Sequence, residues 1–191
     1  MKKIISILAV LAMIMPFAGC SAAKDPGETV DAFVSALHAK NIKEAEKYVS
    51  GGFSVSDNPQ VNQMAERMFI KLGCTADSFE VLSQDSAKAT VSVRAVDAQV
   101  LWVAWMGEYA LSIGMIEKHG DTISEEEARE LLAYYLDKNL DQADYLDYQT
   151  EIWFVRENGM WKMLMNDSLK DVLTGGLITF ISTMKEGTGI S

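Results

Sequence analysis

Four titratable side chains have the types needed for acid–base chemistry. Glu108 lies between two aromatic residues in an apolar segment, where burial would raise the pKa of its carboxyl group. Asp97 follows an expected strand, and His38 and His119 stand beside lysines near expected helix ends. None of the four falls at the spacing of a catalytic motif. The sequence therefore favours a solvent-facing rim position for Glu108 and solvated positions for both histidines, and predicts no catalytic residue.

The sequence offers little for a metal ion. It contains 2 Cys and 2 His, which excludes a four-thiolate zinc site and disfavours a multi-histidine centre. A calcium loop beginning at Asp137 would need Gly at its sixth position and Glu at its twelfth, where this chain has Gln142 and Tyr148. Asp137, Asp141 and Asp144 instead fall on one helix face, as a solvated acidic stripe or a weak, nonspecific divalent-cation site. No metal and no cofactor is predicted.

The N-terminus has the pattern of a lipoprotein signal peptide. Lys2 and Lys3 precede an apolar run of 12 residues, which suits a signal-peptide core and is too short to span a bilayer comfortably. Proline then breaks the run before the segment Phe-Ala-Gly-Cys20, which resembles a lipobox. Phe17 departs from that pattern, because an aliphatic residue is usual there. We expect Cys20 to be lipidated and to become the new N-terminus.

Three parts of the chain follow from this assignment. We predict a signal peptide over residues 1–19, a lipidated cysteine with a short tether over 20–25, and a single domain over 26–191. The alternative is an ordinary secretory peptide cleaved two or three residues after Cys20. The remaining cysteine, Cys74, has no disulfide partner once Cys20 is lipidated, and we expect a small buried hydrophobe rather than a reactive thiol.

Charge and composition restrict the class of protein. The chain is 49% hydrophobic with only 3 Pro, which predicts a folded domain. Its net charge is −10, and without the two lysines of the signal peptide it becomes −12. Such a surface repels nucleic acid and anionic lipid headgroups, so neither is a natural partner of the domain.

The hydrophobic period predicts both helices and strands. Capping residues and apolar spacing indicate a helix from Pro26, a short helix from Asn41 to the glycines at 51–52, and a third helix from Pro59 to Gly73. Alternation indicates strands near 79–81, 87–95, 148–156 and 160–165, the last two joined by an Asn-Gly hairpin turn. A helical pair over about 99–116 and 124–140 lies between the strands, and a final helix from Asp167 is expected to bend at Gly175-Gly176.

The segment from Gln99 to Ile116 is the most apolar part of the domain. Because a carboxylate stands at its centre, a buried helix is favoured over a membrane span. Its aromatic side chains, with those of the late strands, are expected to pack in the core; a ligand pocket is the alternative. The residues of that possible pocket are Trp102, Trp105, Glu108, Tyr109, Trp153 and Trp161.

The order of elements resembles that of the nuclear transport factor two-like superfamily. The segment from Thr29 to Ser50 resembles its first two helices, and Glu157-Asn158-Gly159-Met160-Trp161-Lys162 resembles its closing hairpin. The resemblance implies an α+β fold: a twisted antiparallel sheet of about four strands covered by N-terminal helices, here with an inserted helical pair and a C-terminal helix. It also implies a cone-shaped sheet that can enclose a pocket. Residues 98–146 depart from the compact family pattern.

The combination predicts a membrane-anchored lipoprotein on the extracytoplasmic face of the cell membrane. We expect a non-enzymatic binding or interaction module for a protein, a peptide or a small apolar ligand. The resemblance also implies an alternative, because enzymes of that superfamily hold a carboxyl group inside the cone. That alternative is a small isomerase or dehydratase using Glu108 or Asp97.

Overall fold

The computed structural model describes residues 25–119 and 121–188 and has an α+β fold. Five strands form one open, mixed sheet in the order β1-β5-β4-β3-β2. All pairs are antiparallel except β1 with β5, which are parallel. The prediction of an α+β fold is confirmed. The strands are β1 (Val49–Ser50), β2 (Gly73–Val81), β3 (Ser86–Val96), β4 (Tyr145–Glu157) and β5 (Met160–Leu164).

Two strands depart from the sequence-based expectation. Val49 was expected inside a helix, but the helix ends early and Val49 pairs with Met163 as part of β1. Gly73 was expected to end a helix, but it begins β2, which pairs with β3 along its whole length and bulges at Asp77. The backbone N–H and C=O groups of the long strand β3 need hydrogen-bond partners, and β2 supplies them on one edge of β3.

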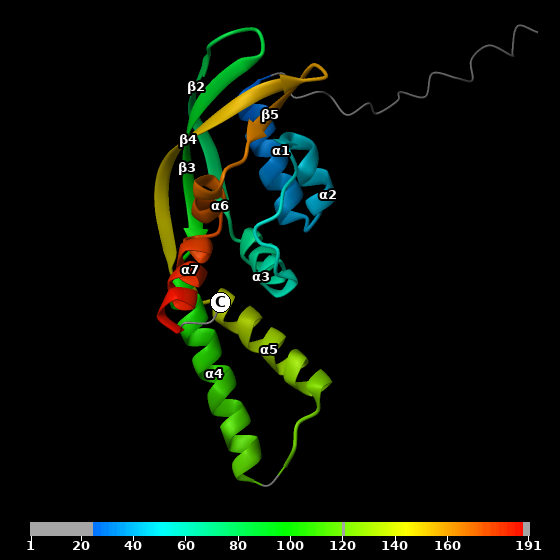
Figure 1. The fold of residues 1–191 in the computed structure, drawn as a ribbon, viewed down its shortest axis with the longest axis vertical. Helices are drawn as coiled ribbons and strands as arrows, with labels where there is room; N and C mark the ends of the chain where they lie inside the picture. Colours follow the sequence, from blue (N-terminus) through cyan, green and yellow to red (C-terminus); the bar gives the residue numbers. More distant parts are fainter. Residues whose placement is uncertain (1–24, 120, 189–191) are drawn as a thin grey trace, which may run out of the picture.

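Helices cover one face of this sheet (Figure 1). The side chain of Asp25 accepts a hydrogen bond from the Glu28 N–H and caps α1, and Asn41 caps α2 in the same way. The buried face of α1 includes Phe33 and Leu37, which join the core beneath the sheet. The helices of this layer are α1 (Pro26–His38), α2 (Ile42–Ala45), the 3₁₀ turn Glu46–Tyr48 and α3 (Pro59–Phe69).

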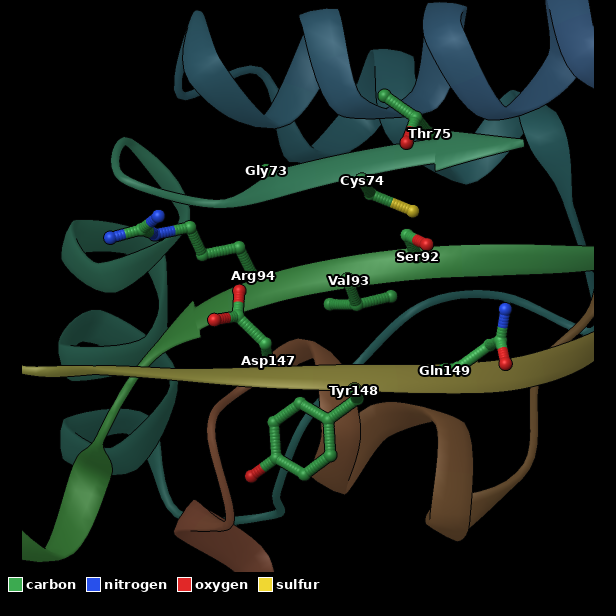
Figure 2. Close-up of a pocket in the computed structure, with 9 residues that line it drawn as sticks. All are labelled: Gly73, Cys74, Thr75, Ser92, Val93, Arg94, Asp147, Tyr148 and Gln149. Carbon is green, nitrogen blue, oxygen red and sulfur yellow. The ribbon is translucent and has the colours of Figure 1, made fainter. Parts of the chain in front are cut away.

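The opposite face of the sheet is polar and uncovered around the ends of β2, β3 and β4. Ser92 and Arg94 of β3 are exposed, and they stand beside Gln149 and Asp147 of β4 in register (Figure 2). This alternation along β3 agrees with the predicted half-buried strand. The residues between them on the inner face, such as Val93, are buried.

The late hairpin forms as the sequence predicts. Asn158 and Gly159 both have positive φ angles, 53° and 80°, and connect β4 to β5 by a two-residue turn. The hairpin sets the register in which Trp161 faces the helical layer with 4% of its surface exposed.

The inserted helices α4 (Ala98–Lys118) and α5 (Glu125–Leu140) form a hairpin that projects from one end of the sheet (Figure 1). The predicted capping box of Ser124 and Glu127 begins α5. Within residues 25–119 and 121–188, each helix is either too short or too polar to span a lipid bilayer.

The C-terminal segment forms two helices rather than one bent helix. Asn166 caps α6 (Asp167–Leu173), and α7 (Leu177–Thr188) begins after Gly175 and Gly176. Both glycines have positive φ angles, 58° and 82°, which a continuous α-helix cannot contain. At this break the Gly175 carbonyl accepts a hydrogen bond from the Ala98 N–H at 3.0 Å, which ties the turn to the start of α4.

Candidate functional site

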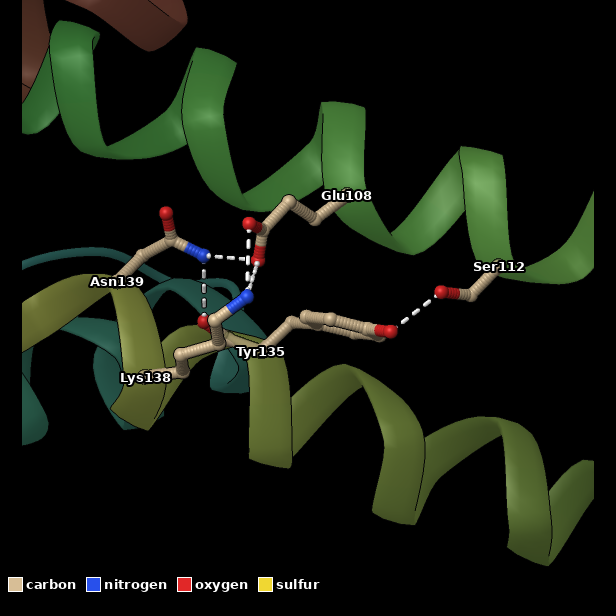
Figure 3. Close-up of polar contacts among 5 residues, drawn as sticks. All are labelled: Glu108, Ser112, Tyr135, Lys138 and Asn139. Carbon is tan, nitrogen blue, oxygen red and sulfur yellow. Dashed lines mark hydrogen bonds and ion pairs between the residues drawn. The ribbon is translucent and has the colours of Figure 1, made fainter.

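Glu108 is held by two side chains of α5 (Figure 3). Its carboxylate accepts hydrogen bonds from Lys138 Nζ at 2.9 and 3.0 Å and from Asn139 Nδ2 at 3.0 Å. The hydrogen bonds from Lys138 and, to a smaller extent, the one from Asn139 hold the pKa of Glu108 below its ordinary value of 4.5. The group is therefore ionised near neutral pH and is unsuited to act as a general acid there.

The Glu108–Lys138 pair makes stability depend on pH. Because these contacts lower the pKa of Glu108 in the folded state, they stabilise that state at pH values above 4.5. The stabilisation is lost as the pH falls through the pKa that Glu108 has in the folded protein. We expect Glu108→Gln to be less stable than the parent chain near pH 7 and to match it at strongly acidic pH. Urea unfolding at several pH values measures this difference. The control, Glu130→Gln, changes an exposed carboxylate of α5 and leaves the contact between Glu108 and Lys138 intact; equal losses in both variants would contradict the prediction.

The aromatic side chains of α4 pack between helices. Trp105 is 7% exposed, and its Nε1–H donates to the Leu132 carbonyl at 2.8 Å. Trp102 lies edge-on against Trp105, with ring centroids 5.3 Å apart, and its ring is 5.9 Å from that of Phe180 on α7. These residues thus connect α4 with α5 and α7, whereas Tyr109 is half-buried further along α4.

The structure does not bring the six residues of the possible pocket together. Trp153 and Trp161 lie on opposite faces of the sheet, and Trp153 is 46% exposed. Trp161 is buried under α1, where its carbonyl accepts a hydrogen bond from Thr29 Oγ1 at 3.3 Å. The remaining four residues belong to the α4–α5 hairpin. The sequence could not show that Trp153 and Trp161 lie on opposite faces of the sheet, because that depends on how β4 pairs with β5 and on which face the helices cover.

The other candidate acid–base residues have structural contacts. Asp97 caps α4 by accepting hydrogen bonds from the N–H groups of Gln99 and Val100, both at 3.0 Å. His38 Nε2 bonds to the Leu72 carbonyl at 2.6 Å, and His119 is the exposed C-cap of α4.

Of the three acidic residues expected on one helix face, only Asp137 lies within α5, whereas Asp141 is the C-cap and Asp144 lies beyond it. Two of the three face cations of α3 and of the turn that follows α3. Asp137 pairs with Arg67, and Asp141 pairs with Lys71 at 3.0 Å, although both carboxylates remain exposed. In the described part of the chain, no group of three or more His, Cys, Asp or Glu side chains is placed to hold a metal ion.

Cys74 is a buried thiol of β2. It is 7% exposed, and burial, followed by the negative charges of Asp31 and Asp77, raises its pKa to about 12. We expect the folded Cys20→Ser chain to resist thiol-specific dyes at pH 8 and to react at once in urea, because the thiolate is the reactive form. An exposed cysteine introduced by Gln84→Cys should react in the folded state. Comparable labelling of Cys74 without urea would show that the thiol is accessible.

A groove of about 640 Å³ lies between β4 and the α6–α7 turn. Tyr148 lies in it, and burial, followed by the charges of Asp171 and Asp97, raises the pKa of its hydroxyl group. The Asp171 carboxylate accepts hydrogen bonds from the Thr179 N–H at 3.0 Å and from the Thr179 Oγ1 hydroxyl at 2.6 Å. The walls combine these polar groups with apolar side chains, including Phe180. Of the four acid–base candidates predicted from the sequence, Asp97 is the one that lines this groove.

The largest unexplained feature is an apolar face of α4. It is exposed over four turns, and its large side chains Val103, Leu111 and Met115 are 64%, 69% and 59% exposed. Glu108 is the only charged residue between positions 98 and 116, and it faces α5. We call this surface the α4 stripe; it consists of Val100, Val103, Ala104, Gly107, Ala110, Leu111, Gly114 and Met115.

The α4 stripe corrects the expectation of a buried helix. Only Ala98, Leu101 and Trp105 of α4 are buried. The sequence pattern missed the exposed face because α4 is apolar on every side and has no polar face to indicate solvent. The signal that was available is the set of small residues recurring every three or four positions, which allows another helix to approach closely.

No protein-family model matches the chain, and no curated protein sequence matches it. One similar solved structure is ycdA of Bacillus subtilis subsp. subtilis strain 168, a protein described as a "putative lipoprotein". The two are 16% identical with a TM-score of 0.42, over 75% of this chain and 45% of that protein. The chain therefore spans less than half the length of ycdA.

Proposed function

We propose that this protein is an extracytoplasmic lipoprotein that acts as a non-enzymatic docking module for another protein. Acyl chains on Cys20 hold it on the membrane, and the α4 stripe is the surface that meets the partner. The exposed, uncharged α4 stripe is the observation that carries the docking role, because monomeric domains rarely expose a contiguous apolar patch of this extent.

The contacts of the carboxylates support a binding role over catalysis. Glu108 is an ionised member of an ion pair, and Asp97 is committed to capping α4. An isomerase or dehydratase would need a carboxyl group free to exchange a proton with its substrate, whereas these two carboxylates are engaged by groups of the protein. The resemblance to the nuclear transport factor two-like superfamily stays a prediction, since the sheet is open and mixed rather than a closed cone.

The chemistry of the α4 stripe fits a helix of the partner protein. Small residues such as Gly107 and Gly114 let a second helix approach the α4 backbone, and Val103 and Leu111 form ridges that such a helix can pack against. The domain has a net charge of −12 without its signal peptide, so a partner with basic residues beside its apolar stripe gains electrostatic attraction.

Replacing Cys20 with Ser tests the anchor. We expect the variant to move from the detergent-extracted membrane fraction to a soluble or unprocessed pool, because two or three acyl chains retain a protein durably. The acidic domain gains nothing from an anionic membrane, so the acyl chains must supply the retention. A Cys20→Ser variant that is still cleaved and still membrane-bound would refute the lipoprotein assignment.

A photo-reactive amino acid at Val103 or Leu111 tests the docking surface. In cells, we expect each substitution to give one discrete protein adduct, and Gly107→Glu in the same chain to abolish it. The matched control carries the photo-reactive residue at Glu126, which is exposed on α5 and lies outside the α4 stripe. An adduct at twice the mass of the chain would identify the partner as a second copy. A full-length, membrane-bound chain that gives no adduct from either stripe position would reject this function.

A further inference from the structure

The described chain begins at one end of the molecule. Asp25 caps α1, and the start of α1 lies against β2, where a Cβ atom placed on Gly27 would be 3.9 Å from that of Ala76. Figure 1 shows the start of α1, the β2–β3 turn and the β4–β5 turn at this end, and the turn between α4 and α5 at the opposite end. The start of α1 therefore lies toward the end of the molecule that carries the two hairpin turns.

The same end exposes apolar side chains. Phe79, Val81 and Leu82 are 53%, 56% and 43% exposed, and we call them the hairpin-tip patch. Phe79 and Val81 pair with Ala89 and Ala87, whose side chains lie on the helix-covered face of the sheet. The patch is uncovered because β2 continues past Ala76, where α1 begins, so no turn of α1 lies over its last residues.

Charged groups around the hairpin-tip patch are largely paired with each other. Glu80 lies 3.6 Å from Lys88, which also pairs with Glu151 at 3.2 Å. Asp85 adds one carboxylate at the turn. The patch therefore offers apolar contact to a surface and has no excess of positive charge with which to attract anionic lipid.

The length of the tether limits how far this end can move from an anchor. Five residue steps separate Cys20 from Asp25, and at 3.3–3.6 Å per residue they span at most about 18 Å. We propose that the hairpin-tip patch rests on the lipid bilayer, with Phe79, Val81 and Leu82 among the headgroups, so that the α4–α5 hairpin points away from the membrane. This orientation depends on the proposed lipidation of Cys20. Aromatic and aliphatic side chains at a headgroup boundary lose contact with water there, which stabilises the contact.

Dye quenching in vesicles tests the orientation with the acylated full chain. One variant carries Gln84→Cys in the β2–β3 turn, and its matched partner carries Asp121→Cys in the turn between α4 and α5. Helix α4 lies between the two sites, and its 21 residues extend about 30 Å at 1.5 Å per residue. Each protein is labelled with a thiol-reactive fluorophore and placed in phosphatidylcholine vesicles that contain lipid spin-labelled at the headgroup. Cys74 is too buried to take the label.

We expect quenching several times stronger at position 84 than at position 121. Adding Phe79→Ser and Val81→Ser should reduce quenching at position 84 to the level at position 121, and both changes affect side chains that are more than half exposed. Unchanged quenching in the double variant would show that the patch does not touch lipid and would overturn the proposal. Equal quenching at the two positions, or stronger quenching at position 121, would also overturn it.

Mass spectrometry of the same samples separates this proposal from the proposed function. A cleaved chain whose Cys20 carries no acyl group would defeat both. An acylated Cys20 with unquenched dye at position 84 would overturn only the bilayer contact, and would leave the tether or another protein as the cover of the hairpin-tip patch.

Discussion

Gly175→Ala is expected to destabilise the protein by more than about 4 kcal/mol, which few single substitutions reach. A Cβ atom on Gly175 would lie 1.7 Å from the Val96 carbonyl oxygen and 2.8 Å from the Val96 carbonyl carbon. Both are backbone atoms at the end of β3, so relieving the overlap would require moving β3 or the α6–α7 turn. The shift would also strain the hydrogen bond from the Ala98 N–H to the Gly175 carbonyl. Urea unfolding followed by tryptophan fluorescence measures the loss.

Gly176→Ala is the matched control. Gly176 also has a positive φ, 82°, but a Cβ there would meet nothing closer than the Tyr148 hydroxyl oxygen at 3.9 Å. Only the backbone preference is then affected, at about 1–2 kcal/mol for a left-handed residue. A similar loss in the two variants would mean that backbone strain, rather than the close approach of β3, fixes this turn.

Trp161→Ala is expected to cost about 3–5 kcal/mol, the usual range for removing a buried tryptophan. Its side chain is 4% exposed and shares the inner face of β5 with Met163, which is 1% exposed. The Arg156 guanidinium lies 5.2 Å from the centre of its ring on the remaining open side. Because α1 packs directly above, the cavity left by the ring cannot collapse without moving that helix. The free energy of unfolding from urea titration measures the cost.

Trp153→Ala removes a side chain of the same type from the adjacent strand. Trp153 is 46% exposed on the opposite, largely uncovered face of the sheet, so its loss is expected to cost about 1 kcal/mol or less. A cost for Trp161→Ala below that of Trp153→Ala would show that the inner face of β5 is not part of the stabilising core.

Local chemistry made several elements predictable from the sequence. Ser124 and Glu127 can cap a helix only at its start, and the Asn158-Gly159 pair readily adopts the two positive φ angles of a tight hairpin. The alternation along β3 has one register that buries its apolar residues, which fixed both the strand and its inner face. The burial of Cys74 followed from its apolar character, although its place in β2 did not.

Long-range contacts decided the elements that sequence reasoning misplaced. Val49 precedes the glycines that end the expected helix, and its pairing with Met163 on the edge of β5 is a long-range contact that the local sequence does not show. A helix through Gly175 would be locally possible; in the structure the turn lies against the end of β3, and the Gly175 carbonyl accepts a hydrogen bond from the first residue of α4.

The candidate functional residues also divide into those that the local sequence predicts and those that depend on long-range contacts. The lipobox around Cys20 is a continuous motif, so the sequence alone predicts it. The partner of Glu108, by contrast, is Lys138, thirty positions away on another helix, and no local pattern could have named it. The exposed face of α4 was also beyond the sequence, because a helix that is apolar on all sides has no polar face to mark the solvent. Only the packing of α5 and α7 against α4 determines that Trp105 is buried while Val103 and Leu111 face water.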